Sequence, residues 1–572
     1  MTGGFTMTAF YVAALLTAPL SLLLLGFYRR AVTRAMREQA GVPAAKFPNP
    51  QLSDNMDHPC DELPVDVIDA DTPIPLSRTR AALDTSATSR VIFVYLAAGI
   101  LFTLIIVSAM HLTVGADLYL GWTLWWFVLD AWPLPLTAAI VRGSAGRELI
   151  RIWGGYGLAL AAVSVVCLVI YDGMDVQFLF SNALTTILVG LPVVALLYRP
   201  VRAVAMLVFA FLLLLLSLTP PLGLAALRGF VSLAAGDGHW QLPARFLLSI
   251  VHTEGIVILI ILIMVGITGL FAWWVLNRLG SAYLRKRLSD QSLLLDSLWA
   301  VVALSHIILL STQGDPPASG VAWIMLPLMA FAAFFVTTRA GLRVLAEQRR
   351  RSDNAPVLLW LRVFALGKRG ERLFQLLTPR WRRTGSMALI TGPDLATGTV
   401  QPNQFLEYLA RRIRMQFIVD DKDLERRLAN LDLRPDPDGL YRINQFFCFA
   451  DTWQCAIQRL SRQTDVVLMD LRGFSHENRG CLYELQTLRE SVSPDRVLLL
   501  IDHTTDWPFL ASTLHRIWTD PKYAAASSGG VTRCPRILRL KHSDSTEVDA
   551  IMTTIQNAIL RGIRTGAPSA GF

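Results

Sequence analysis

The sequence predicts a multi-pass α-helical membrane region followed by an α/β domain built on a doubly wound parallel sheet. Hydrophobic residues make up 53% of the 572 residues and charged residues only 17%, whereas soluble chains average about 25% charged residues. This composition excludes both a disordered chain and an ordinary soluble enzyme. The long apolar runs all precede residue 340, and after residue 354 short apolar runs alternate with amphipathic stretches, as in alternating strands and helices.

Apolar runs long enough to cross about 30 Å of hydrocarbon recur in the first part of the chain, and they predict nine membrane spans. They lie near residues 8–27, 91–112, 119–141, 153–171, 176–197, 202–221, 246–277, 292–312 and 319–338. Basic residues gather in alternate short loops, as Arg147 and Arg151 do after the third run. Because basic loops stay in the cytoplasm, we expect the N-terminus outside and the C-terminal region inside the cell.

The apolar runs, and the composition of the stretches between them, divide the chain into six predicted parts. These are a first span (1–28), a mostly irregular cytoplasmic loop (29–90), eight further spans (91–338), a basic juxtamembrane segment (339–383), an α/β domain (354–562) and a flexible tail (563–572). The basic segment holds twelve Lys or Arg against three Asp or Glu. It predicts contact with the anionic inner leaflet of a plasma membrane, such as a bacterial inner membrane. No groove-reading motif accompanies it, so we expect no nucleic-acid partner.

Five strands are expected in the α/β domain, each followed by a helical stretch. They are Val357–Phe364, Met387–Thr391, Asp465–Leu471, Arg496–Asp502 and Arg536–Leu540. Strands that are apolar on both faces predict a buried parallel sheet, here of the flavodoxin-like type. Such sheets bind ligands at the carboxyl ends of their strands, which makes Phe364, Thr391, Asp470, Asp502 and His503 candidate ligand-binding residues. Two prolines, Pro435 and Pro437, indicate a loop insertion over 415–447.

The segment that follows the third expected strand is the richest in polar groups. Arg472 and His476 lie in a polar loop and are further candidate ligand-binding residues, and Glu484 lies in the first turn of the next helix. Arg472 could bind a phosphate or form an ion pair with Asp470 or Glu477. Glu484 could act on a ligand, or it could simply be favoured by the helix dipole. None of the cysteines has the spacing of metal ligands, so no metal site is expected.

The helix that begins Gly480-Cys481-Leu482-Tyr483-Glu484-Leu485 resembles the W-C-x-x-E-L motif of TIR domains. The order of strands and helices over 354–562 is similar to that family as well, but the membrane spans are not covered. Gly480 replaces the family's Trp, and the first strand ends in Leu361-Arg362-Val363-Phe364 rather than in an F-I-S-Y type sequence. The resemblance implies that Glu484 is the catalytic carboxylate of an NAD-cleaving domain. It also implies NAD as a substrate, no bound cofactor, and assembly into homo-oligomers.

Cleavage of NAD breaks a glycosidic bond through an oxocarbenium-like transition state. One carboxylate beside the ribose can stabilise that positive charge, and nicotinamide leaves as a neutral base without a general acid. A single Glu is therefore chemically sufficient.

Several ionisable residues lie within the apolar runs, where such groups are costly and often functional. They are Asp130, His252, Glu254, Asp296 and His306. They predict either a path for protons or cations or hydrogen bonds between helices. Three functions follow as hypotheses: a membrane-anchored signalling or defence effector that hydrolyses NAD or docks other TIR-like domains, a transporter or channel with a non-catalytic regulatory domain, and a non-catalytic scaffold.

Overall fold

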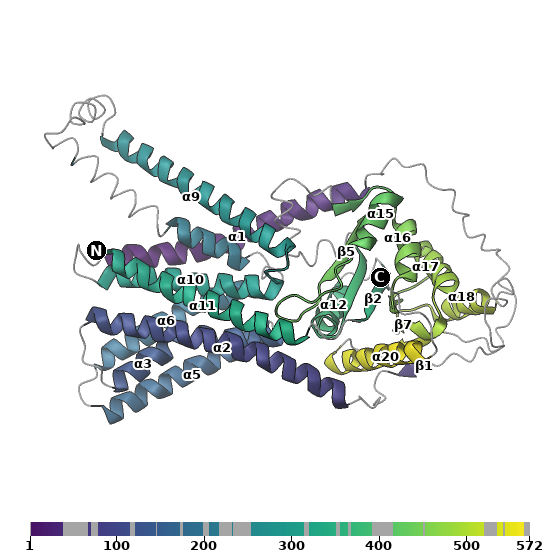
Figure 1. Ribbon diagram of the computed structural model, residues 1–572, viewed down its shortest axis with the longest axis horizontal. Coiled ribbons are helices and arrows are strands. Elements are labelled where there is room, and N and C mark those ends of the chain that lie inside the picture. The colour runs from purple at the N-terminus through teal and green to yellow at the C-terminus, as the bar shows by residue number, and fades with distance from the viewer. Residues whose placement is uncertain are drawn as a thin grey trace. The chain divides into compact units, whose positions relative to one another are not determined.

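The computed structural model describes most of the chain in sixteen segments. They are residues 2–37, 67–69, 78–114, 120–144, 146–171, 175–197, 205–216, 232, 253–313, 320–349, 355–363, 368–391, 416–449, 452–519, 535–541 and 544–564. The chain forms two compact units (Figure 1). The helical unit contains Met1–Gly26, Ala87–Glu347 and Gln401–Leu406, and the sheet unit contains Phe27–Ser86, Gln348–Val400 and Glu407–Phe572.

Helices account for most of the predicted apolar runs. They are α1 (Thr2–Arg37), α2 (Arg78–Val114), α3 (Leu120–Asp130), α4 (Pro133–Arg142), α5 (Arg147–Ile170), α6 (Val176–Leu196), α9 (Thr253–Leu284), α10 (Asp290–Gln313) and α11 (Gly320–Arg349). In the described segments, six helices are long and apolar enough to span a membrane, and the bent pair α3–α4 would make a seventh. Two of the nine predicted spans, 292–312 and 202–221, are not among these helices. Helix α10 covers the first, and a short helix, Ala205–Leu216, covers the described part of the second. Helices α1 and α2 also extend into the range 29–90, which was predicted as irregular.

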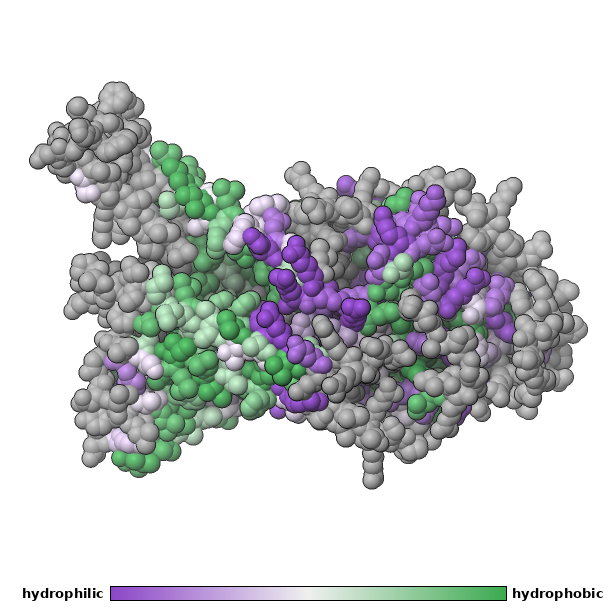
Figure 2. Space-filling model, in the orientation of Figure 1, coloured by the Kyte–Doolittle hydropathy of each residue, from purple (hydrophilic) through white to green (hydrophobic). Residues whose placement is uncertain are grey.

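The helices turn many large apolar side chains outward. Leu158, Val169 and Leu270 are each more than 70% exposed, and Figure 2 shows a broad hydrophobic surface over these helices. Apolar side chains on the outside are expected where lipid replaces water as the surrounding solvent. The helical unit is therefore compatible with a multi-pass membrane region.

All eight described strands pair in parallel in one sheet. They are β1 (Val67–Asp69), β2 (Val357–Arg362), β3 (Ser386–Thr391), β4 (Phe417–Ile418), β5 (Ile443–Cys448), β6 (Val466–Asp470), β7 (Val497–Ile501) and β8 (Arg536–Arg539). Their order is β1-β8-β7-β6-β2-β3-β5-β4. The five predicted strands are present, in the order expected of a doubly wound sheet, but β1, β4 and β5 were not predicted. The loop insertion predicted over 415–447 is wrong, because β4, a helix and most of β5 lie there.

Helices cover both faces of the sheet (Figure 1). On one face, α12 (Lys368–Trp381) and α20 (Ser545–Arg564) pack against the apolar side chains of β2, β6, β7 and β8. The other face carries α15 (Asp421–Ala429), α16 (Trp453–Arg462), α17 (Arg479–Ser491) and α18 (Trp507–Thr519). From β2 the chain continues to β3 on one side, and β6, β7 and β8 follow on the other side. The reversal between β2 and β6 is a topological switch point, where sheets of this kind form a crevice. The helical stretch expected after the strand Met387–Thr391, near residues 404–413, lies outside the described residues.

Candidate functional site

Two charged residues end the central strands on either side of the switch point. Arg362 is the last residue of β2 and stands opposite Asp470, the last residue of β6. Both are buried, with exposed fractions of 3% and 0%. Because side chains alternate along a strand, both lie on the same face as Trp360 and Leu468, which pack against α12 and α20. Buried charges at strand ends thus mark the carboxyl edge of the sheet.

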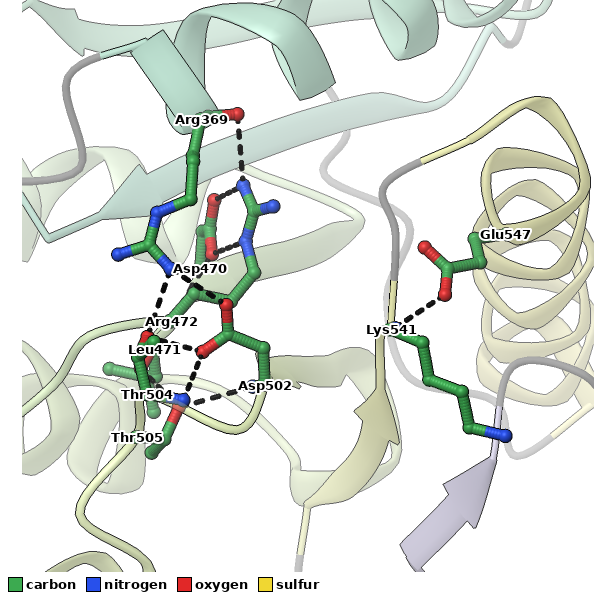
Figure 3. A network of polar contacts seen from close by, with 9 residues as sticks. All are labelled: Arg369, Asp470, Leu471, Arg472, Asp502, Thr504, Thr505, Lys541 and Glu547. Atoms are coloured by element: carbon green, nitrogen blue, oxygen red, sulfur yellow. Dashed lines mark hydrogen bonds and ion pairs between the residues drawn. The ribbon is translucent and has the colours of Figure 1, made fainter.

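Asp470 is held in a bidentate ion pair by Arg472, two residues further along the chain (Figure 3). Nε of Arg472 donates to Oδ1 at 2.7 Å and Nη2 donates to Oδ2 at 2.6 Å. Nη2 also donates a longer bond, 3.4 Å, to the backbone carbonyl of Arg369. Burial alone would lower the pKa of Arg472, but Asp470 and the nearby carboxylates raise it above its usual value. The guanidinium is therefore a permanent cation whose Nε and Nη2 already donate hydrogen bonds.

A second ion pair joins α12 to the loop after β7. Nη1 of Arg369 donates to Oδ2 of Asp502 and to the hydroxyl of Thr504, each at 3.1 Å (Figure 3). Asp502 also accepts from the backbone N–H of Thr504 at 2.9 Å. The hydroxyl of Thr505 donates to the carbonyl of Leu471 at 3.1 Å, which ties this loop to the loop after β6. The Arg369 side chain is half exposed, so it is a cation at this edge that solvent reaches.

Glu484 lies in the second turn of α17, because the helix begins at Arg479 rather than at Cys481. The prediction of a carboxylate in the first turn is therefore wrong, and the helix dipole explains less of its presence. Its side chain is buried, with 2% exposed, and Oε2 has no hydrogen-bond partner among the described residues. Burial raises the pKa of Glu484 to about 8, although the positive charge of Arg362 opposes this shift. Glu484 is thus mainly a neutral acid at neutral pH.

Cys481 shares the buried face of α17 with Glu484. Burial raises the pKa of the Cys481 thiol well above its usual value, and Glu484, when ionised, and Asp470 raise it further. A thiol that stays protonated is a poor nucleophile. Cys481 therefore serves as a small apolar core residue.

The structure brings together only part of the predicted ligand-binding set. Asp470, Arg472 and Asp502 lie in one network, while His476 and His503 are exposed and His476 contacts the ring of Phe509. Thr391 ends β3, but its side chain and all of Phe364 lie outside the described part of the chain.

Two cations of this edge, Arg362 and Arg369, were not predicted as site residues. Both lie in the basic segment 339–383, which was assigned to the membrane surface as a whole. The structure divides this segment among the end of α11, strand β2 and helix α12. A basic residue at the end of an otherwise apolar strand was the signal for Arg362.

In the helical unit two of the candidate ionisable residues meet. Oδ1 of Asp130 lies 3.1 Å from Nε2 of His306. Asp296 instead forms an ion pair with Arg339, a partner that was not predicted. His252 and the side chain of Glu254 lie outside the described residues.

The described segments contain no group of three or more His, Cys, Asp or Glu side chains that could hold a metal ion. The chain matches no protein-family model, no curated protein and no solved structure. What is established is a class: a chain with several apolar helices of membrane-spanning length and an all-parallel sheet covered by helices on both faces.

Proposed function

We propose that this protein is a membrane-anchored signalling or defence effector whose TIR-like sheet unit hydrolyses NAD, with Glu484 as the catalytic carboxylate. One observation carries the proposal. A buried carboxyl group lies on α17, within electrostatic reach of Arg362 at the switch point, and its Oε2 has no hydrogen-bond partner in the described part of the chain. An unpartnered buried oxygen costs about 1–3 kcal/mol, so its retention calls for a ligand or a catalytic role.

The proposed reaction breaks the bond between the ribose C1 and the nicotinamide nitrogen. The bonding electron pair stays on the nitrogen, which neutralises the pyridinium ring, and water adds its hydroxyl to C1 while its second proton goes to solvent. Ionised Glu484 stabilises the positive charge that develops on the ribose. Arg472 is committed to Asp470, so the half-exposed Arg369 is the better candidate to meet a phosphate group.

The raised pKa of Glu484 predicts how the rate of NAD cleavage depends on pH. Catalysis needs the ionised form of Glu484, and in the free protein this form dominates only above about pH 8. The rate at low NAD concentration should therefore rise as the pH increases through about 8. The cationic nicotinamide ring favours the carboxylate, so saturating NAD should move the rise to a lower pH.

The test uses the full-length protein in lipid nanodiscs, concentrated to favour assembly and incubated with NAD. Nicotinamide release is measured for the parent protein, for Glu484→Gln and for Glu490→Gln. Glu490 is exposed on the same helix, so it is a matched control. We expect release by the parent and by Glu490→Gln, and a loss of at least about 100-fold in Glu484→Gln. Equal release by Glu484→Gln would remove Glu484 from the mechanism. No release by any folded protein would favour docking of partner domains or a scaffold.

Cellular placement belongs to the same proposal. The sheet unit would lie in the cytoplasm, beneath a plasma membrane such as a bacterial inner membrane, and the chain would act as a homo-oligomer. The basic residues near the end of α11 would contact the anionic leaflet.

A further inference from the structure

The apolar helix pair α3–α4, a candidate membrane span, is broken near its middle. Helix α3 ends at Asp130, α4 begins at Pro133, and the two are bent by 40°. Proline has no N–H, so Pro133 cannot donate to the carbonyl of Leu129 four residues earlier. The hydroxyl of Tyr156, from α5, donates to that carbonyl at 2.9 Å instead. A tertiary contact thus maintains the break, and the acidic side chain lies directly at it.

The acid at the break meets a histidine from another helix. Oδ1 of Asp130 and Nε2 of His306 are 3.1 Å apart, and the two residues are only 6% and 5% exposed. The other ring nitrogen of His306, Nδ1, lies 2.8 Å from the carbonyl of Val302. A carbonyl can only accept, so Nδ1 must carry a hydrogen. In a neutral ring Nε2 is then left with a lone pair.

This tautomer determines how many protons the contact holds. If Asp130 were ionised and His306 neutral, two lone pairs would face each other at 3.1 Å. The contact therefore needs one proton, either on Asp130, which donates to the neutral ring, or on Nε2, which donates to the carboxylate. We infer that Asp130 and His306 form a binding site for one exchangeable proton inside the membrane region, and that loss of this proton opens the contact between the α3–α4 break and α10. The inference does not depend on the proposed NAD chemistry.

The described residues around Asp130 and His306 supply no competing ion. In the described part of the chain, Asp130 interacts with two titratable side chains, His306 of α10 and Tyr156 of α5. Helix α2 contributes the ring of Phe102, 6.2 Å from the His306 ring. The ion pair of Asp296 with Arg339 involves the residue ten positions earlier on α10, about 15 Å away along the helix.

One carboxylate oxygen also remains available at the site. Oδ2 of Asp130 is buried and has no hydrogen-bond partner among the described residues. A purely structural acid would be expected to engage both oxygens. The free oxygen, the helix break and the one-proton contact together point to a group whose protonation changes. Broken helices and buried acid–histidine contacts are features that membrane proteins use to bind ions.

The experiment follows the ring nitrogens of His306 directly. Full-length protein labelled with ¹⁵N-histidine is reconstituted in lipid bilayers and examined by solid-state NMR over about pH 4–9, which covers the ordinary carboxyl and imidazole ranges. The His306 signals are assigned as those missing from His306→Gln. We expect Nδ1 to stay protonated in the parent while Nε2 changes its protonation with pH.

Variants separate a proton site from a structural hydrogen bond. Asp130→Asn can still form a hydrogen bond to His306 but carries no charge, so we expect the proton affinity of His306 to fall by at least about tenfold. Asp130→Glu should restore the titration. Ser305→Ala is the matched control, because the Ser305 hydroxyl bonds to the same Val302 carbonyl without contacting Asp130. Identical titration curves in the parent and Asp130→Asn, or a His306 ring that never changes state in the parent, would overturn the inference.

Discussion

The helical unit and the sheet unit each bury an aspartate beside a basic partner, yet the two pairs have different consequences. In the sheet unit, Arg472 holds both oxygens of Asp470 through two hydrogen bonds. In the helical unit, His306 contacts one oxygen of Asp130 and leaves the other without a partner among the described residues. An arginine keeps its proton at all physiological pH values, whereas a histidine exchanges it. The basic residue therefore determines whether a buried ion pair keeps its proton permanently or can exchange it with pH.

Removal of the arginine should give the largest effect on stability. Arg472→Met leaves Asp470 fully buried without its counter-charge, which should destabilise the sheet unit by about 3–5 kcal/mol. Hydrogen exchange of the β6 amides in the full-length protein measures this opening free energy. The double variant Asp470→Leu with Arg472→Met should recover much of the loss, because it removes both partners of the buried ion pair. A loss of stability below about 1 kcal/mol in the single variant would show that the ion pair contributes little to the stability of the sheet unit.

The next prediction concerns Glu484 and follows from the direction of its pKa shift. The folded state holds the Glu484 proton up to about pH 8, whereas the unfolded chain releases it near the ordinary value of about 4.3. Stability from this group is complete at low pH and is lost as the pH rises to about 8. Glu484→Gln should therefore match the parent near pH 5 and exceed it by roughly 2–4 kcal/mol near pH 9. Thermal unfolding at both pH values, with Glu490→Gln beside it, measures the difference, and a gap that does not depend on pH would contradict the assignment.

A smaller effect is expected at the helix break. Tyr156→Phe removes the hydroxyl that bonds to the carbonyls of Val128 and Leu129, at a cost of about 0.5–1.5 kcal/mol. Unfolding in mixed detergent micelles measures it, and Tyr11→Phe on the exposed surface of α1 is the control. If both variants unfold alike, the hydroxyl does not support the break.

The smallest effect should come from the exposed end of the sheet network. Arg369→Gln removes an ion pair whose arginine is half exposed, so we expect a loss below about 1 kcal/mol. Exchange of the amides in the loop after β7 should increase while the amides of β6 stay protected. An equal increase in the exchange of the β6 amides would mean that the two ion pairs are energetically coupled.

Much of the sheet could be predicted because its central strands are continuous apolar runs. β2, β6 and β7 are buried along their whole length, which a sequence displays directly. β5 was missed because Asn444 and Gln445 interrupt its apolar pattern. β1 and β4 span only three and two residues, too few for any periodicity. Short edge strands are determined by their partners in the sheet rather than by their own residues.

At the candidate sites too, some features could be predicted from the sequence and others could not. Asp130 and His306 were predicted as ionisable residues within apolar runs, and Asp470 and Arg472 as candidates at the ligand-binding edge of the sheet. Asp470 and Arg472 are two positions apart, and their ion pair was one of the stated alternatives. Asp130 and His306 are 176 positions apart, so only packing of the helices brings them together. Residue type thus indicates which groups are costly to bury, and tertiary structure decides which partner offsets the cost.

Strand β1 has a consequence for the order in which the protein is synthesised. Val67 pairs with Ile537 of β8, 537 − 67 = 470 positions later in the chain. At about 5–20 residues per second, the ribosome completes the partner strand roughly 20–90 s after β1 emerges. During that interval this short segment, located between the first two long apolar helices, has no strand to join. The edge strand β1 can therefore join the sheet only late in translation. A chain truncated before β8 would leave β1 without its partner strand.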